Sequence, residues 1–179
     1  LGIDAIVASK ATSLALVYAF FPGEAGGVPV ANTLFGLENR WGKLPLTLYP
    51  LNYTTQLAVD ALNMTAGPGR TYKYYTGPVL YPMGFGLSYT TFTLTGTCPT
   101  SSSPSSSPSP SRPLVPGAGP IVCSVTVTNT GGMTGDEVVQ AYVVPTAASL
   151  SPQPPFVPTR YIVGFRRVTA AQVAQKLPS

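Results

Sequence analysis

A serine- and proline-rich stretch divides this chain into two parts. The stretch itself cannot contribute to a hydrophobic core, so the packed structure must come from the residues before and after it. Between Pro99 and Pro120 the sequence is PTSSSPSSSPSPSRPLVPGAGP. Proline fixes φ and has no backbone N–H, and the stretch has no apolar periodicity, so its composition favours extended, solvated polyproline II. We therefore expect residues 99–120 to form an insertion or stalk, with the packed parts of the chain before and after it.

The part before the insertion has the pattern of an α/β layer. The run Leu14–Phe21 is continuously apolar and ends at a Pro-Gly pair, which predicts a strand buried on both faces. The segment Glu24–Gly36 predicts a helix, because an acidic residue suits a helix N-terminus and glycine is a natural stop. The segment Gly42–Pro50 contains two prolines and predicts an extended conformation. Strand, turn and helix in this order indicate a piece of an α/β fold.

The part after residue 86 has the pattern of an antiparallel β-sandwich. Alternating residues predict four short strands, at residues 86–97, 121–131, 136–145 and 160–168. The turns are rich in Thr, Gly and Asn, which is typical of sandwiches. Because a complete sandwich of this type needs about seven strands, we expect an incomplete one, and we expect the chain to be a fragment.

Two cysteines and two glycosylation sequons indicate the compartment. Cys98 and Cys123 flank the insertion. They could form a disulfide, which would constrain the unfolded chain by roughly 3 kcal/mol for a loop of about 25 residues, or remain two buried thiols. The sequons at Asn52 and Asn63 favour the disulfide, because N-glycosylation and disulfides both belong to the secretory pathway. We therefore expect a secreted, extracellular glycoprotein.

The composition excludes several classes of site and partner. The chain has no histidine and two cysteines, so neither a Ser-His-Asp triad nor a common His- or Cys-rich metal site is possible, and we expect no metal or cofactor. A net charge of +4 without a basic run argues against a nucleic-acid partner. The apolar run Ser13–Phe21 has nine residues against ~20 for a membrane span, which argues against a membrane partner. The sequence gives no sign that two of its six carboxylates converge.

Four motifs follow one another along the chain: FPGEAGGVPVANTLFG, GKLPLTLYP, GPGRTYKYYTG and YPMGFGLSYTTF. Together they resemble the C-terminal part of glycoside hydrolase family 3, in its plant-type β-D-xylosidase/α-L-arabinofuranosidase branch. The later VTVTNTGGMTGDEVVQAYV and PTRYIVGFRRV resemble the fibronectin type III-like domain that ends such enzymes. The resemblance implies an α/β-sandwich fragment followed by an incomplete all-β sandwich: residues 1–66 end the α/β-sandwich domain, 67–86 connect the domains, and 87–179 form a truncated fibronectin type III-like domain with the 99–120 insertion.

The resemblance also implies a function. It indicates a secreted retaining glycoside hydrolase acting on β-xylosides or α-arabinosides of cell-wall polysaccharides, whose chemistry uses two carboxylates about 5–5.5 Å apart. In the family, the nucleophilic Asp lies in a barrel domain and the acid/base Glu lies upstream of the PGEAGG motif. The resemblance therefore assigns no catalytic residue to this chain, which we expect to be inactive alone. Glu24 is expected to have only a structural role, at a helix N-terminus.

A second interpretation is a non-catalytic, wall-associated glycoprotein or binding module. The serine–proline composition fits it, because such runs resemble the O-glycosylated segments of plant and green-algal wall proteins. The sequence upstream of Leu1 would discriminate the two interpretations, since only the first requires a barrel domain there.

The stretch Arg70–Tyr75 is the remaining candidate for a ligand site. Alternating tyrosines predict an extended segment with one buried face. In one interpretation the stretch is a domain-joining clamp, in which Arg70 pairs with a carboxylate and the tyrosines pack with their hydroxyls bonded. In the other it is an aromatic rim near the substrate entrance, with Arg70 and Tyr72 as substrate-binding residues. The clamp is favoured, because the loop before it is several residues shorter than in the family.

Overall fold

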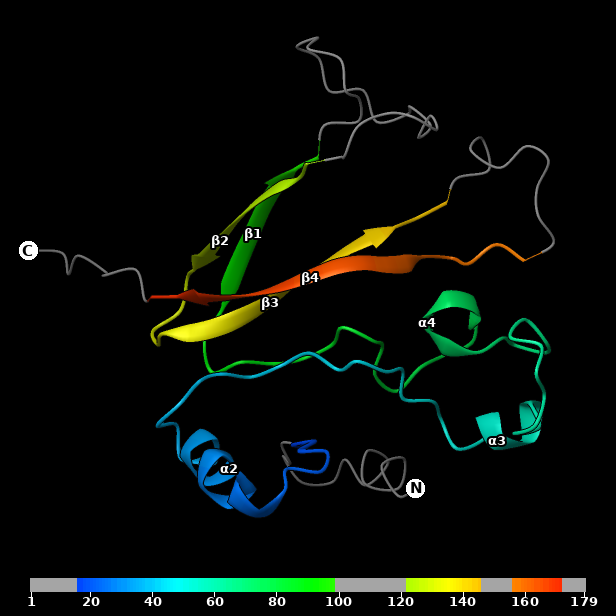
Figure 1. The fold of residues 1–179 in the computed structure, drawn as a ribbon, viewed down its shortest axis with the longest axis horizontal. Helices are drawn as coiled ribbons and strands as arrows, with labels where there is room; N and C mark the ends of the chain where they lie inside the picture. Colours follow the sequence, from blue (N-terminus) through cyan, green and yellow to red (C-terminus); the bar gives the residue numbers. More distant parts are fainter. Residues whose placement is uncertain (1–15, 99–121, 146–155, 172–179) are drawn as a thin grey trace, which may run out of the picture.

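The structure is a computed structural model that describes residues 16–98, 122–145 and 156–171. The serine–proline insertion predicted at residues 99–120 lies outside these ranges. Figure 1 shows two pairs of strands on one side of the molecule and the helices on the other, with long irregular segments running between them. The elements are η1 Glu24–Gly26, α2 Gly27–Leu34, α3 Tyr53–Gln56, α4 Thr71–Tyr74, β1 Phe92–Thr97, β2 Ser124–Asn129, β3 Gly135–Val143 and β4 Tyr161–Ala170.

The helix expected between Glu24 and Gly36 is confirmed. Residues 24–26 form the single 3₁₀ turn η1, with Glu24 in its first turn, and α2 follows directly. The backbone N–H of Phe35 still donates to Ala31 O at 2.9 Å, and Gly36 then takes a φ of +73°, which stops the helix. Local signals in the sequence are therefore sufficient to define this element.

The strand predicted at residues 14–21 is wrong for its described part. Residues 16–21 form no strand and are exposed, with Phe21 98% exposed. A strand buried on both faces needs hydrogen-bonded neighbours and a cover on each face. No described segment pairs with residues 16–21. Instead, residues of this run line one side of the groove described below.

The extended segment expected at Gly42–Pro50 is confirmed and lies beside residues 80–86. The backbone N–H of Leu44 donates to Phe85 O at 2.8 Å, and Gly84 N–H donates back to Leu44 O at 2.7 Å. Farther along, Leu48 and Tyr81 form an antiparallel bridge. Two segments that are distant in sequence thus form one irregular ribbon below the strands.

The four predicted strands are present as two separate two-stranded antiparallel sheets. The pair β1–β2 runs from Phe92 opposite Asn129 to Thr97 opposite Ser124. The next pair of residues, Cys98 and Cys123, is joined by a disulfide with an S–S distance of 2.09 Å. The first strand begins at Phe92 rather than at residue 86, and before it the backbone N–H groups of Tyr89 and Thr90 donate to side-chain oxygens of Asn39 and Ser88.

The second sheet is longer. The pair β3–β4 runs from Gly135 opposite Ala170 to Val143 opposite Tyr161, with an irregularity between Ala141 and Tyr142. The two sheets remain separate, so the structure shows strand pairs and not a closed sandwich. The division into an α/β-sandwich part and a fibronectin type III-like part stays a prediction.

The interior of the described part is polar. No described hydrophobic side chain is fully buried. Five polar or charged residues are buried: Asn39, Thr90, Asn129, Asp136 and Glu137. Large apolar side chains such as Leu62, 95% exposed, lie at the surface. Hydrogen bonds and ion pairs are therefore prominent among the contacts between the described segments. None of the described helices is long and apolar enough to cross a membrane.

Candidate functional site

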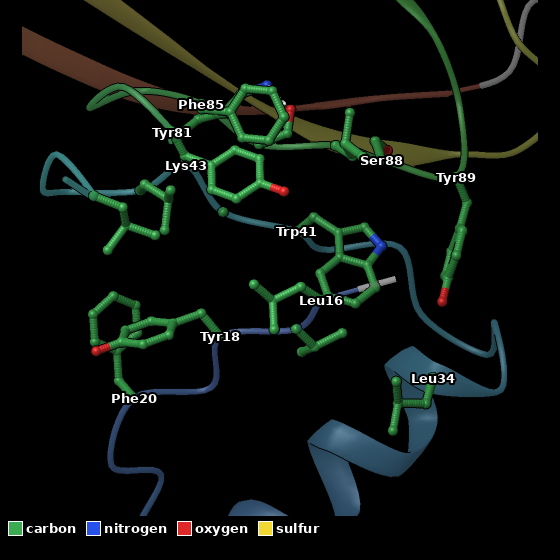
Figure 2. Close-up of a pocket in the computed structure, with 16 residues that line it drawn as sticks. Leu16, Tyr18, Phe20, Leu34, Trp41, Lys43, Tyr81, Phe85, Ser88 and Tyr89 are labelled. Carbon is green, nitrogen blue, oxygen red and sulfur yellow. Dashed lines mark hydrogen bonds between the residues drawn. The ribbon is translucent and has the colours of Figure 1, made fainter. Parts of the chain in front are cut away.

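An apolar groove lies between the ribbon of residues 42–48 and 81–89 and the exposed run at residues 16–20 (Figure 2). It encloses about 540 Å³, and Leu34 of α2 lines one end. The indole ring of Trp41 meets the ring of Tyr89 edge to face, with centroids 5.4 Å apart. The groove is therefore walled mainly by aromatic and aliphatic side chains.

Few polar groups in this groove are available to a ligand. Lys43 Nζ already pairs with Glu137 and donates to Gly86 O, and Ser88 Oγ donates to Asn39. The indole Nε1–H of Trp41 is different, because it is buried and no described residue accepts its hydrogen bond. The other polar groups that line the groove are the hydroxyls of Tyr18, Tyr81 and Tyr89, so the groove offers chiefly apolar contact.

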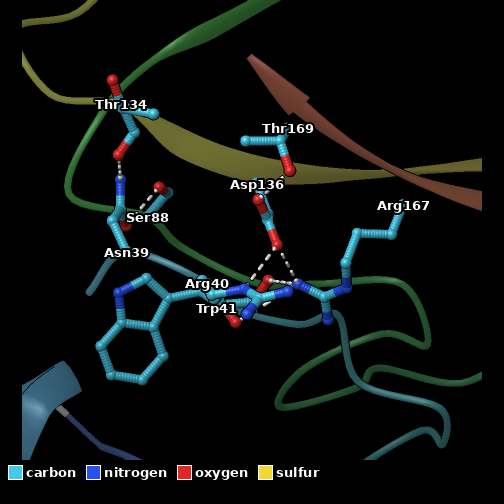
Figure 3. A network of polar contacts seen from close by, with 8 residues as sticks. All are labelled: Asn39, Arg40, Trp41, Ser88, Thr134, Asp136, Arg167 and Thr169. Carbon is cyan, nitrogen blue, oxygen red and sulfur yellow. Dashed lines mark hydrogen bonds and ion pairs between the residues drawn. The ribbon is translucent and has the colours of Figure 1, made fainter. Parts of the chain in front are cut away.

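A polar network joins the groove wall to the second sheet (Figure 3). At its centre is Asp136 in β3, whose side chain is 2% exposed. Its Oδ2 accepts hydrogen bonds from Arg40 Nε at 3.3 Å and Arg167 Nη1 at 3.2 Å, and its Oδ1 accepts one from Thr169 Oγ1 at 2.7 Å. We call Asp136, Arg40, Arg167 and Thr169 the Asp136 network.

Two effects act in opposite directions on the pKa of Asp136. Burial alone would raise the pKa of Asp136, but the hydrogen bonds from Thr169, Arg40 and Arg167 outweigh burial and hold the pKa below its ordinary value. The carboxylate is therefore ionised, and both guanidinium groups are bound to it. Such a carboxylate stabilises structure and is a poor proton donor at neutral pH.

Asn39 extends the contact to the backbone. Its Oδ1 accepts from Ser88 Oγ at 2.9 Å and from Tyr89 N at 3.1 Å, and its Nδ2 donates to Thr134 O at 3.3 Å. The backbone N–H of Asp136 donates to Asn39 O at 3.0 Å. A methyl group on Gly135 would lie 2.3 Å from Asn39 Nδ2, so a larger residue there would force the Asn39 side chain to move.

The neighbouring carboxylate, Glu137, is also paired. It lies 3.0 Å from Lys43 Nζ. Successive side chains of a strand point to opposite faces, so Asp136 and Glu137 diverge and cannot act as a pair on one substrate atom. Within the described ranges no group of His, Cys, Asp and Glu residues could hold a metal ion.

The tyrosine-rich stretch is helical where an extended segment was predicted. Residues Thr71–Tyr74 form α4, closed by hydrogen bonds from Tyr74 N to Arg70 O and from Tyr75 N to Thr71 O. The backbone N–H of Thr71 donates to the hydroxyl of Tyr49 at 2.7 Å. This contact spans 22 residues. The hydrogen bond from Thr71 to Tyr49 holds the start of α4, and the alternating tyrosines of the sequence give no sign of it.

Arg70 and Tyr72, the candidate substrate-binding residues, both make contacts within the chain. Arg70 Nη2 donates to the backbone carbonyls of Ala58 and Val59, so the expected pairing with a carboxylate is wrong. The reason is that two backbone carbonyl oxygens of the preceding loop lie within hydrogen-bond distance of the guanidinium group. The Tyr72 hydroxyl accepts a hydrogen bond from Ile162 N at 3.1 Å, which ties α4 to β4. These contacts fit a clamp better than a substrate rim.

Three tyrosines beside α4 pack against one another. The rings of Tyr49 and Tyr53 stack at 4.1 Å, and Tyr75 meets them edge to face at 4.8 and 5.3 Å. Burial raises the pKa of Tyr49 and of Tyr75. The sequence analysis missed Tyr49 and Tyr53, although their spacing of four residues was a signal that one turn brings them together.

The sequence analysis also missed Arg40 and Arg167 as partners of Asp136. Arg40 is 96 residues from Asp136 in the sequence, and no local pattern connects them. The two sequon asparagines, Asn52 and Asn63, are both exposed. Neither of them contacts the Asp136 network through a hydrogen bond among the described residues.

Comparisons with known proteins agree on one family. Residues 4–89 match the model of the glycosyl hydrolase family 3 C-terminal domain. Beta-D-xylosidase 1 of Arabidopsis thaliana is 51% identical over 82 residues, which are 44% of this chain and 11% of that protein. Exo-1,4-beta-xylosidase bxlB of Emericella nidulans is 35% identical over 174 residues, which are 93% of this chain and 22% of that protein.

Solved structures give the same result for the fold. A GH3 exo-beta-xylosidase (XlnD), in complex with a xylobiose aziridine activity based probe, matches 85% of this chain with a TM-score of 0.58 and 25% identity. A Bifidobacterium adolescentis GH3 beta-glucosidase matches 83% of the chain with a TM-score of 0.57 and 28% identity. This chain covers 20% of each of those structures and 22% of the Emericella relative. With its ordered motifs, its family-model match and these β-xylosidase relatives, the chain belongs to glycosyl hydrolase family 3.

Proposed function

We propose that this chain serves as the C-terminal part of a secreted retaining glycoside hydrolase that acts on β-xylosides or α-arabinosides of cell-wall polysaccharides. The observation that carries the proposal is the relationship to named β-xylosidases over 93% of the chain, of which the chain covers only 22%. In this proposal residues 1–66 complete an α/β-sandwich domain, 67–86 connect the domains, and 87–179 form a fibronectin type III-like domain.

The chemistry that the proposal requires comes from outside this chain. A retaining enzyme needs a nucleophilic carboxylate and an acid/base carboxyl group about 5–5.5 Å apart. Asp136 and Glu137 are bound to Arg40, Arg167 and Lys43 and diverge along β3, which supports a structural role for both. The chain's own contribution is then to hold residues 39–43 and the groove wall firmly against the second sheet.

A chimera tests this function. The matching 22% of Emericella nidulans bxlB would be replaced by this 179-residue chain, and hydrolysis of an aryl β-xyloside would be measured. We expect turnover by the chimera, none by this chain alone, and none by bxlB lacking the segment. A folded but inactive chimera would contradict the proposal, and turnover by the chain alone would show that it carries its own catalytic groups.

The non-catalytic module predicts a different result. It requires this chain alone to bind insoluble wall polysaccharide, which a sedimentation assay measures directly. Under the proposal the isolated chain stays in the supernatant, because the polar groups of the Asp136 network are bound to one another.

A further inference from the structure

We propose that Asn63 carries an N-linked glycan and that Asn52, although it also lies in a sequon, is left largely unmodified. The inference rests on the secretion contained in the proposed function. It goes beyond the sequons themselves, because sequence alone gives Asn52-Tyr53-Thr54 and Asn63-Met64-Thr65 equal standing. The difference between them is structural.

The sequon at Asn63 is formed by local contacts and is open to solvent. Asn63 Oδ1 accepts hydrogen bonds from Thr65 N at 3.0 Å and from Thr65 Oγ1 at 2.8 Å. This is an Asx turn, which the three residues make by themselves. It leaves Asn63 Nδ2, the atom that receives a glycan, without a partner among the described residues. The three residues belong to no helix or strand, and Asn63 and Met64 are exposed.

The chain around Asn63 is anchored so that its side chain faces outward. Arg70 holds the carbonyls of Ala58 and Val59 on one side, and Arg70 N–H donates to Met64 O at 2.8 Å on the other. Leu62 beside the sequon is 95% exposed. A glycan on Asn63 would therefore extend from an exposed asparagine beside an exposed leucine.

The sequon at Asn52 is built into the packed tyrosine cluster. Its middle residue, Tyr53, stacks on Tyr49 at 4.1 Å and donates its hydroxyl to Gly69 O at 3.0 Å. Its threonine hydroxyl, Thr54 Oγ1, donates to the backbone oxygen of Leu51 at 2.8 Å, whereas the Thr65 hydroxyl of the other sequon donates to its asparagine side chain. Residues 53–56 are helical. Once the chain is folded, an oligosaccharyltransferase would have to unwind α3 and move Tyr53 out of the cluster to reach this site.

The reaction is a balanced group transfer. Asn63 Nδ2 forms a bond to the anomeric carbon of an oligosaccharide carried on a lipid pyrophosphate. The bond from that carbon to the pyrophosphate oxygen breaks, the pyrophosphate leaves with the electron pair, and one Nδ2 proton passes to a base of the transferase. The Asx turn uses only Oδ1 and therefore does not compete with this bond.

The test is a site map on the complete 179-residue chain, directed into the secretory pathway of yeast by an added leader. Total lumenal protein, retained or secreted, is digested and deglycosylated in heavy-oxygen water, so that each formerly glycosylated asparagine is marked as heavy aspartate. We expect occupancy at Asn63 to exceed that at Asn52 several-fold. Asn63→Gln should remove most of the glycan mass, and Asn52→Gln should leave the mass nearly unchanged.

Matched variants at Thr65 separate recognition from folding. Thr65→Ser keeps a hydroxyl and should keep the glycan, whereas Thr65→Ala should lose it, with circular dichroism used to compare the two folds. Equal occupancy at both asparagines, preference for Asn52, or no glycan at either would overturn the inference. The map does not depend on catalysis, so an inactive bxlB chimera would contradict the proposed function without touching this result.

Discussion

Replacing Asp136 with Asn tests whether the polar network, rather than an apolar core, holds the described segments together. The variant keeps the size of the side chain and an acceptor for Thr169 but removes the charge bound by Arg40 and Arg167. Breaking a fully buried ion pair costs about 3–5 kcal/mol. Here the two arginine side chains are 67% and 42% exposed and can be rehydrated. We therefore expect a smaller loss, about 2 kcal/mol in the free energy of unfolding.

The pH dependence of this loss has a defined sign. The pKa of Asp136 is lowered in the folded state, so its stabilisation is fully present above its unfolded value of 3.8 and is lost as the pH falls through the folded pKa. The difference in unfolding free energy between the wild type and Asp136→Asn should then shrink from about pH 5 toward about pH 2.

The assay is urea unfolding followed by fluorescence of the single tryptophan, Trp41, which lies next to the network, with circular dichroism as a second probe. Asp60→Asn is the matched control, because it removes the same charge from an exposed side chain. A loss below about 0.5 kcal/mol, the range of ordinary surface substitutions, or a loss that stays constant in acid, would refute the reasoning.

Three further substitutions probe other parts of the fold. Gly135→Ala places a methyl group 2.3 Å from Asn39 Nδ2 and should cost about 1–3 kcal/mol, measured as a lower urea midpoint; an unchanged midpoint would mean that the Asn39 contact gives way freely. Replacing Cys98 and Cys123 together by Ser opens a loop with a separation of 25 residues and should cost about 3 kcal/mol, and the oxidised and reduced wild type should differ by a similar amount. Tyr72→Phe removes the acceptor of a β4 backbone N–H and should cost about 0.5–1.5 kcal/mol and speed hydrogen exchange in β4 but not in β1. Equal protection of β4 in both proteins would exclude that contact.

Elements defined by neighbouring residues could be predicted from the sequence. The helix α2 ends at Leu34, and Gly36 takes a positive φ just beyond it, as the glycine signal predicted; β3 and β4 lie where the sequence predicted strands. The apolar run at residues 16–21 gave the wrong element, because a strand also needs a partner and no described segment supplies one. Its hydrophobicity also predicted burial, whereas the described residues 16–21 are exposed.

The contacts that hold the segments together could not be predicted, because they join residues far apart in the sequence. Arg40 binds Asp136 across 96 residues, and Tyr72 binds the start of β4 across 90. Composition showed that six carboxylates were present but gave no partner for any of them. The tyrosine stretch was misassigned for the same reason, since the Tyr49 hydroxyl fixes the turn of α4 from outside it.

In the proposed function, the catalytic carboxylates lie outside this chain. The most direct test is to map where a xylobiose aziridine probe reacts in the chimera of bxlB and this chain. Such a probe is found bound to the related exo-beta-xylosidase XlnD. After labelling, digestion and mass spectrometry, we expect one labelled peptide from the bxlB portion and none from the 179 residues of this chain. Label on Glu24, Asp60, Asp136 or any other carboxylate of this chain would contradict the account.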